Sequence, residues 1–157
     1  MKFSELFPKA HVIADLTAAA KDDAIREMIK HLCAAGALPK VHAAGVEKTI
    51  LRREELGTTG IGKGIAIPHA KFPGLTGVCG VFARSVKGVE FNALDGQPVH
   101  LIFMLASSPD AVEAHIEALR KITTLIKDND FCAFLRRAKN LAELADLLRE
   151  ADDRLRG

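Results

Sequence analysis

The sequence contains no tryptophan and no tyrosine, and it has only three cysteines in 157 residues. Cys33, Cys79 and Cys132 are odd in number and far apart, which argues against a disulfide framework and against a zinc ribbon. We expect inert thiols among apolar neighbours, as suits a reducing cytoplasm. Long apolar runs are also absent. The longest, residues 101–106, is too short to span a membrane, and residues 1–5 do not resemble the start of a signal peptide.

Neither sign of charge is in clear excess. The sequence has 22 Lys and Arg against 20 Asp and Glu, which gives a formal net charge of +2. So small an excess gives no reason to expect a nucleic-acid partner or a membrane surface. Hydrophobic residues make up 48% and charged residues 27%, as in a soluble globular protein. Because no repeat or linker interrupts the chain, we expect one domain over residues 1–157, large enough to form a core without a disulfide or metal.

The spacing of hydrophobic residues predicts helices and strands in an order that is not a strict alternation. The expected helices in the first third of the chain cover residues 21–33 and 43–55. The expected strands cover residues 65–67, 78–83 and 101–106. The last run is unbroken, which suits a strand buried on both faces.

The residues after the last strand predict a helix. Ser108 suits the N-cap and Pro109 the first helical position. The apolar stripe expected on this helix consists of Val112, Ile116, Leu119, Ile122 and Ile126.

Two further helices are expected in the C-terminal part. Phe131, Phe134 and Leu135 line one of them. The other starts at Asn140, with Glu143 in the capping-box position. Helices before and after a block of strands predict an α/β fold, a single layered domain with a mixed β-sheet flanked by helices.

Residues 57–69 are the most informative segment. Four glycines in eight residues indicate close backbone packing or several positive φ angles: Gly57, Gly60, Gly62 and Gly64. The spacing of Gly57, Gly62 and Lys63 is similar to that of a phosphate-binding P-loop, but Gly64 stands where Ser or Thr would hold magnesium. A P-loop also follows a strand and opens a helix, whereas this segment follows a helix. We therefore expect neither nucleotide binding nor nucleotide hydrolysis.

His69 is the first candidate functional residue. It follows Pro68, whose fixed φ stiffens the chain, and we expect it to end a short strand before a turn-like segment. A histidine on a rigid loop is well placed to meet a ligand, and a neutral imidazole is a good nucleophile and base. The alternative is an ordinary loop histidine.

His115 is the second candidate. It lies three residues after Val112 and one before Ile116, so we expect it to point inward with the apolar stripe near the helix N-terminus. Helix N-termini favour anions, which makes an inward histidine there a candidate phosphate ligand. The alternative is a hydrogen-bonded core histidine.

Arg53 is the third candidate. It shares a predicted helix face with Val46 and Ile50, so we expect it to turn inward. A guanidinium on a half-buried face needs an anionic partner. That partner is either a carboxylate, such as Glu90 or Asp95, or a phosphoryl group.

Residues 53–62 and 64–69 together resemble the active-site signature of phosphotransferase-system enzyme IIA domains of the fructose/mannitol type. The nitrogen-regulatory branch, often called PtsN or enzyme IIA-Ntr, looks nearest. The expected order of helices, glycine-rich loop and strands fits this family over nearly the whole chain.

The resemblance implies a function and a role for each candidate. His69 would accept a phosphoryl group on Nε2 from the phosphocarrier HPr or its nitrogen-branch counterpart NPr. His115, Arg53 and the Thr59 hydroxyl would stabilise the phosphoryl oxygens. The glycines of the loop would allow close approach: Gly60, Gly62 and Gly64. The resemblance implies a phosphotransfer intermediate of transferase type that needs no metal and no other cofactor.

Two residues depart from the family pattern. Lys63 stands where the family often has asparagine, and we expect a cation there to affect attraction to phosphate or to an acidic partner. Glu117 stands where nitrogen-branch members often carry a further histidine.

Three alternatives follow from the site. A regulator would signal to target proteins through its phosphorylation state, whereas a sugar-uptake relay would pass phosphate to a IIB domain. We favour the regulator because the sequence carries no fused IIB or membrane domain. A metal site at His69 and His115 would need a third ligand, and none stands at ligand spacing.

Overall fold

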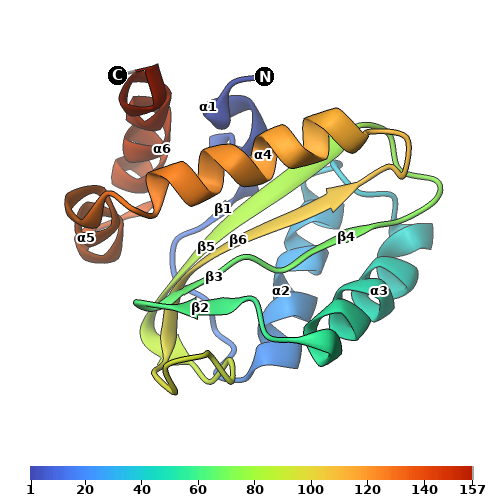
Figure 1. The fold of residues 1–157 in the computed structure, drawn as a ribbon, viewed down its shortest axis with the longest axis horizontal. Helices are drawn as coiled ribbons and strands as arrows, with labels where there is room; N and C mark the ends of the chain where they lie inside the picture. Colours follow the sequence, from blue (N-terminus) through green and yellow to red (C-terminus); the bar gives the residue numbers. More distant parts are fainter. Residues whose placement is uncertain (157) are drawn as a thin grey trace.

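The computed structural model describes residues 1–156, and Gly157, the last residue of the expected domain, lies outside this range. A mixed six-stranded sheet has helices against both of its faces (Figure 1). The strand order is β1-β5-β6-β3-β2, and β4 pairs with β6. The expected α/β fold with a mixed sheet flanked by helices is therefore confirmed.

The helices and strands have the following bounds. The helices are α1 (Phe3–Leu6), α2 (Lys21–Ala34), α3 (Ala43–Leu56), α4 (Val112–Leu125), α5 (Asn129–Arg137) and α6 (Leu141–Arg156). The strands are β1 (Val12–Ile13), β2 (Gly60–Gly62), β3 (Ile65–Ala66), β4 (His69–Lys71), β5 (Val78–Val89) and β6 (Val99–Ser107).

Strand β6 is the centre of the sheet. It runs antiparallel to β5 and parallel to both β3 and β4. Leu101, Phe103 and Leu105 pack with α1, α4, α5 and α6, while Ile102 and Met104 pack with α2 and α3. Successive side chains of a strand point to opposite faces, so the unbroken apolar run supplies both cores. The prediction that this strand is buried on both faces is confirmed.

Helix α4 begins later than predicted. The Ser108 side chain accepts from the Asp110 amide in a turn, and the helix starts at Val112 without a side-chain cap. The predicted apolar stripe is confirmed at Leu119, Ile122 and Ile126, which pack in the core, and is wrong at Val112 and Ile116, which are 46% and 50% exposed. The buried face consists of His115, Ala118, Ile122 and Leu125. His115 therefore lies on the buried face, as predicted.

The C-terminal helices agree better with their predicted starts. The Asn140 side chain accepts from the Glu143 amide at the start of α6, as expected of a cap. In α5, Phe131 and Leu135 are buried, but Phe134 is 43% exposed, so its predicted place in the core was wrong. In residues 1–156, no helix is both long and apolar enough to cross a membrane.

Candidate functional site

His69 is the first residue of β4, where it lies beside Leu105 of β6. It therefore begins a strand, contrary to the prediction that it ends one. Its Nδ1 atom is 2.8 Å from the carbonyl oxygen of Ile67. Because a carbonyl oxygen only accepts hydrogen bonds, Nδ1 carries the proton, and the neutral ring keeps a free lone pair on Nε2. The ring is half-buried.

His115 lies in the first turn of α4 and is only 5% exposed. Its ring centroid is 5.6 Å from that of His69, so the structure brings the two predicted histidines together. The His115 Nδ1 atom is 2.6 Å from the hydroxyl oxygen of Ser107, the buried last residue of β6. A hydroxyl can donate or accept, so this partner allows the proton on either ring nitrogen. Sequence analysis missed Ser107 as a site residue.

The environment of His115 favours its neutral form. Burial lowers the pKa of His115 most, and the neighbouring His69 and Lys71 lower it further. Lys71 is exposed and lies two residues after His69 on β4. The site therefore combines two histidines with a nearby cation that the motif alone did not single out.

The topology explains why two histidines far apart in the sequence meet. β4 runs parallel to β6, with His69 opposite Leu105 and Lys71 opposite Ser107. The chain leaves β6 at Ser107 and turns directly into α4, where the first inward side chain is His115. Both histidines consequently lie at the end of β6 where the chain turns into α4 (Figure 1), a place where α/β folds commonly bind ligands.

Arg53 lies in the last turn of α3 and is only half-buried. Its guanidinium donates to the carbonyl oxygen of Gly57 at 2.8 Å. The expected carboxylate partners have other roles, since Glu90 accepts from the Asn92 amide and Asp95 accepts from backbone amides. Arg53 therefore helps to close the end of α3 and keeps an accessible positive charge.

The buried charge on α3 belongs to Glu54, which is 6% exposed and which sequence analysis did not single out. Its carboxylate accepts from the Lys21 ammonium at 3.0 Å and from the Thr59 amide at 3.1 Å. The Thr59 hydroxyl also donates to Glu54, so in this structure it is not directed at a phosphoryl group, as we had expected. The Thr59 carbonyl accepts from the Ile67 amide at 3.1 Å. Glu54 thus supports the residue whose carbonyl fixes the His69 ring.

The glycine-rich segment forms a hairpin of β2 and β3, with both of the properties predicted from its glycines. A Cβ atom at Gly60 would lie 2.9 Å from the Ala93 backbone, so this position requires close packing. Gly62 and Gly64 have φ angles of +103° and +76°. These structural requirements account for the glycines without a ligand. The hairpin also differs from a P-loop, which leads from a strand into a helix.

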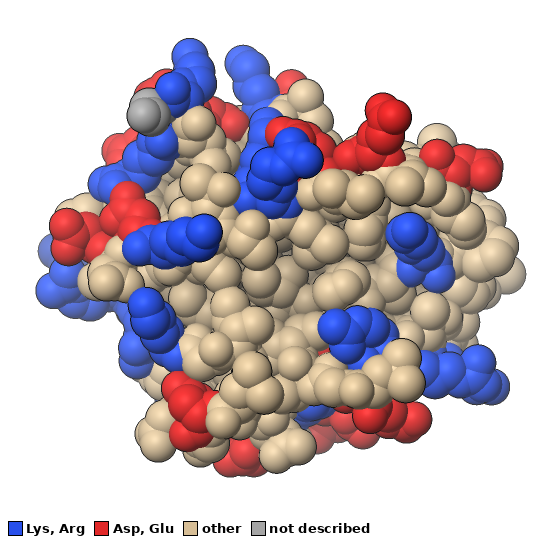
Figure 2. Space-filling model, viewed as in Figure 1, with Lys and Arg blue, Asp and Glu red and all other residues tan. Residues whose placement is uncertain are grey.

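The molecular face that carries α4, β2 and β4 has a distinctive charge pattern. Figure 2 shows uncharged groups over the middle of this face and both cationic and acidic side chains around its border. Ile61 on β2 and Val112 and Ile116 on α4 are 46–50% exposed. Within residues 1–156, no group of three or more His, Cys, Asp or Glu side chains is placed to hold a metal ion.

Comparisons with known proteins agree with this geometry. Residues 5–151 match the family described as "Phosphoenolpyruvate-dependent sugar phosphotransferase system, EIIA 2". A nitrogen regulatory protein of Bradyrhizobium diazoefficiens is 33% identical over 148 residues, which cover 94% of this chain and 95% of that protein. The crystal structure of the nitrogen regulatory protein IIA-Ntr from Neisseria meningitidis superposes with a TM-score of 0.82 at 31% identity, covering 92% of this chain and 97% of that one.

A third relative belongs to a longer protein. The fructose-specific EIIABC component of Bacillus subtilis is 37% identical over 152 residues, which cover 97% of this chain but only 24% of that protein. The chain thus spans about a quarter of that relative and nearly all of the nitrogen regulatory protein. The match over residues 5–151, with the two paired histidines inside it, establishes that the chain belongs to the EIIA 2 family of the phosphoenolpyruvate-dependent sugar phosphotransferase system.

Proposed function

We propose that this chain is a phosphohistidine carrier that accepts a phosphoryl group from HPr or NPr on Nε2 of His69. The observation that carries the proposal is the 2.8 Å contact between His69 Nδ1 and the Ile67 carbonyl oxygen. This contact holds the proton on Nδ1 and leaves the Nε2 lone pair free to act as a nucleophile. The buried His115, 5.6 Å away between ring centroids, supplies a second polar group beside the first.

The transfer is a displacement at phosphorus. The Nε2 lone pair of His69 forms the new N–P bond while the N–P bond to the donor histidine breaks, and the donor ring leaves with that electron pair. His69 keeps its Nδ1 proton, and the Ile67 carbonyl stabilises the positive charge that the ring acquires. Such a transfer depends mainly on positioning and on stabilisation of charge.

Three groups have roles in stabilising the phosphoryl oxygens. His115 is kept neutral by burial and donates from Nε2 when the Ser107 hydroxyl donates to its Nδ1. Lys71, two residues after His69 on β4, adds a positive charge, which also lowers the pKa of His115. Arg53, half-buried at the end of α3, supplies a guanidinium that suits phosphate oxygens.

We further propose that the phosphorylation state controls which proteins the chain binds. Adding close to two negative charges to the largely uncharged middle of the face that carries α4, β2 and β4 would change its docking properties. The relatives from Bradyrhizobium and Neisseria, each named a nitrogen regulatory protein, support a regulator. The fructose-specific relative from Bacillus supports the second candidate, a relay to a IIB domain. A cytoplasmic location belongs to the proposal, in keeping with three free thiols.

Mass spectrometry of the intact protein tests the proposal. The wild type, His69→Ala and the control His31→Ala are incubated with phosphoenolpyruvate, enzyme I and HPr or NPr. His31 is a suitable control because it lies on α2, where its ring is hydrogen-bonded to the Ala10 carbonyl. One acid-labile phosphate on the wild type and on His31→Ala, and none on His69→Ala, is the expected result. Stoichiometric phosphorylation of His69→Ala would refute the proposal.

Transfer to a IIB domain separates the two candidates. The phosphorylated protein is mixed with IIB domains of the fructose and mannitol types, and the phosphate on each chain is followed with time. A regulator keeps its phosphate, whereas a relay loses it within the mixing time to one of the domains.

A further inference from the structure

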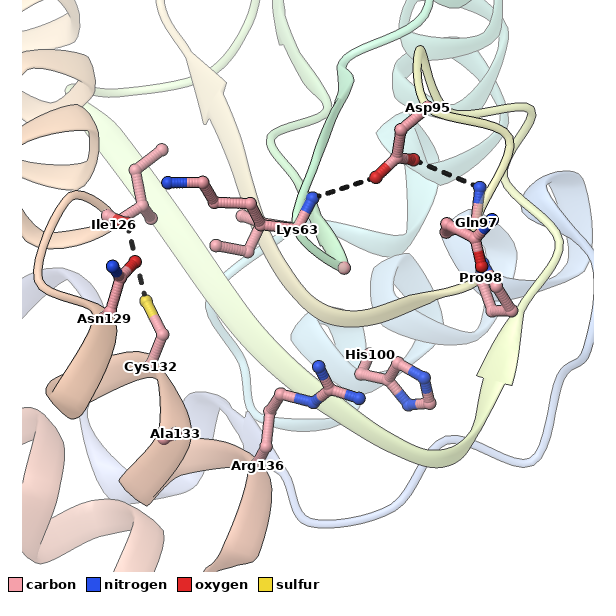
Figure 3. Close-up of a pocket in the computed structure, with 12 residues that line it drawn as sticks. Lys63, Asp95, Gln97, Pro98, His100, Ile126, Asn129, Cys132, Ala133 and Arg136 are labelled. Atoms are coloured by element: carbon pink, nitrogen blue, oxygen red, sulfur yellow. Dashed lines mark hydrogen bonds between the residues drawn. The ribbon is translucent and has the colours of Figure 1, made fainter.

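A cavity of about 450 Å³ lies beside the C-terminal end of α4, and Figure 3 shows the residues that line it. The turn between β2 and β3, the start of β6 and one side of α5 surround it. Ile126, which directly follows α4, lines the cavity and lies eleven residues from His115, or about 16 Å of helical rise. The cavity is therefore separate from the two histidines, and its volume is in the range of small-molecule sites.

Two cations from different elements border this cavity. Lys63 comes from the β2–β3 turn and Arg136 from α5. Figure 3 shows the Arg136 guanidinium turned toward His100, beside Gly64 of the β2–β3 turn, and the Lys63 ammonium turned toward Ile126. Within residues 1–156, neither the ammonium of Lys63 nor the guanidinium of Arg136 forms an ion pair. Both charges remain available for a ligand.

Asp95 is the one acidic residue among the described residues that line the cavity. One of its carboxylate oxygens accepts from the Lys63 amide at 3.1 Å, and the other accepts from the Gln97 amide at 3.1 Å. Figure 3 shows the carboxylate between these two amides, away from Arg136. Asp95 therefore holds the shape of the turn, and it leaves the two cationic side chains unpaired.

The backbone at Lys63 supports a role for its side chain. Lys63 has a φ of 58°, in the left-handed region, between two glycines that also have positive φ angles. Glycine and asparagine adopt this conformation more readily than lysine does. A lysine in this conformation, exposed and beside a cavity, adds little to packing and adds a positive charge. A strained position that keeps a charged side chain points to a function for that charge.

We propose that this cavity binds a small phosphate-bearing anion between Lys63 and Arg136. A phosphomonoester carries close to two negative charges at neutral pH, which matches the two cations. The planar guanidinium of Arg136 suits two phosphate oxygens, and the ammonium of Lys63 acts as a point charge. The His100 ring, held by its contact of 2.8 Å with the Ser85 carbonyl, forms a wall of the cavity. The site would act as a receptor for phosphate, either free or carried by a metabolite, and it does not rest on phosphorylation of His69.

Titration followed by ¹H–¹⁵N NMR tests this site. Inorganic phosphate and glycerol 3-phosphate are added to the unphosphorylated protein at constant ionic strength. The variants are Lys63→Asn, which suits the left-handed backbone, and Arg136→Gln. Arg137→Gln is the matched control, since it removes the same charge from the next residue of α5, outside the cavity lining. His69→Gln shows whether the ligand binds at the histidine pair instead.

The expected result is saturable shifts at Gly64, His100 and Ala133, with affinity at least tenfold weaker in Lys63→Asn and in Arg136→Gln. Arg137→Gln and His69→Gln would bind as the wild type does. Tighter binding of glycerol 3-phosphate would identify a metabolite, and equal binding would identify free phosphate. Shifts that do not saturate, that survive in both cavity variants, or that vanish in His69→Gln would overturn the proposal.

Discussion

The two histidines of the candidate site are held by different kinds of partner. On the β3–β4 side, a backbone carbonyl accepts from Nδ1 of His69. On the β6–α4 side, the Ser107 hydroxyl meets Nδ1 of His115. The carbonyl permits one tautomer of the neutral ring, whereas the hydroxyl permits both.

This difference indicates a division of roles. His69 is fixed as a nucleophile because its free lone pair always lies on Nε2. His115 is buried, neutral and adaptable, so it can change from acceptor to donor when a phosphoryl group arrives. Substitutions can therefore remove the partners of His69 and those of His115 separately.

Glu54→Ala, a substitution on the β3–β4 side of the histidine pair, is expected to have the largest effect, which is on stability. It removes the buried partner of Lys21 and Thr59 and weakens the support of Ile67, so the free energy of unfolding should fall by about 3 kcal/mol. Urea denaturation measures this change. The control Glu55→Ala alters an exposed neighbour and should change stability by less than about 0.5 kcal/mol. Equal losses of stability in the two variants would show that the contacts of Glu54 with Lys21 and Thr59 do not stabilise the fold.

His115→Ala is expected to slow phosphoryl transfer to His69 about 100-fold, because it removes one donor to the phosphoryl oxygens. His115→Gln retains an N–H donor and should recover part of the rate. Rapid-quench measurement with phosphorylated HPr or NPr gives both rates. If His115→Ala transfers at the wild-type rate, His115 is a core histidine only.

Ser107→Ala is expected to slow the same transfer about tenfold, since an unpaired Nδ1 no longer favours the donor form of Nε2. The effect should disappear in the His115→Ala background, because Ser107 acts through His115. A double-mutant cycle with the same rapid-quench assay measures this coupling. Additive effects of the two substitutions would contradict this positioning role.

The smallest expected effect is a pH dependence of stability. Burial lowers the pKa of His115 below its ordinary value of 6.5, so the unfolded state binds more protons than the folded state. The contribution of His115 to stability is therefore present above pH 6.5 and is lost as the pH falls through the folded pKa. Urea midpoints from pH 7.5 to 5 should fall less steeply for His115→Gln than for the wild type. The same pH dependence of the urea midpoint in both proteins would contradict a lowered pKa of His115.

Much of the site could be predicted from sequence because it depends on local patterns. The segment from Gly57 to His69 resembles the family's active-site signature. The unbroken apolar run of residues 101–106 predicted the central strand β6. Thr59, Gly60, Gly62 and Gly64 lie where the motif placed them, but their contacts serve the hairpin and Glu54.

The parts of the site that the sequence did not predict depend on tertiary contacts. The burial of Glu54 in place of Arg53 depends on Lys21, which is 33 residues away in sequence. The role of Ser107 depends on its contact with His115, which joins the end of β6 to the start of α4. Helix periodicity predicted the inward orientation of His115 correctly, but the exposure of Val112 and Ile116 on the same helix is seen only in the packed structure.

Nitrogen-detected NMR of the His69 ring, before and after phosphorylation, is the decisive experiment for the proton position and the phosphorylation site. Before phosphorylation we expect a proton on Nδ1 and an unprotonated Nε2. After incubation with the phosphorylated carrier we expect a ³¹P–¹⁵N coupling to Nε2 with Nδ1 still bound to the Ile67 carbonyl. A proton on Nε2 in the free protein, or a phosphoryl group on Nδ1 or on another residue, would contradict these expectations.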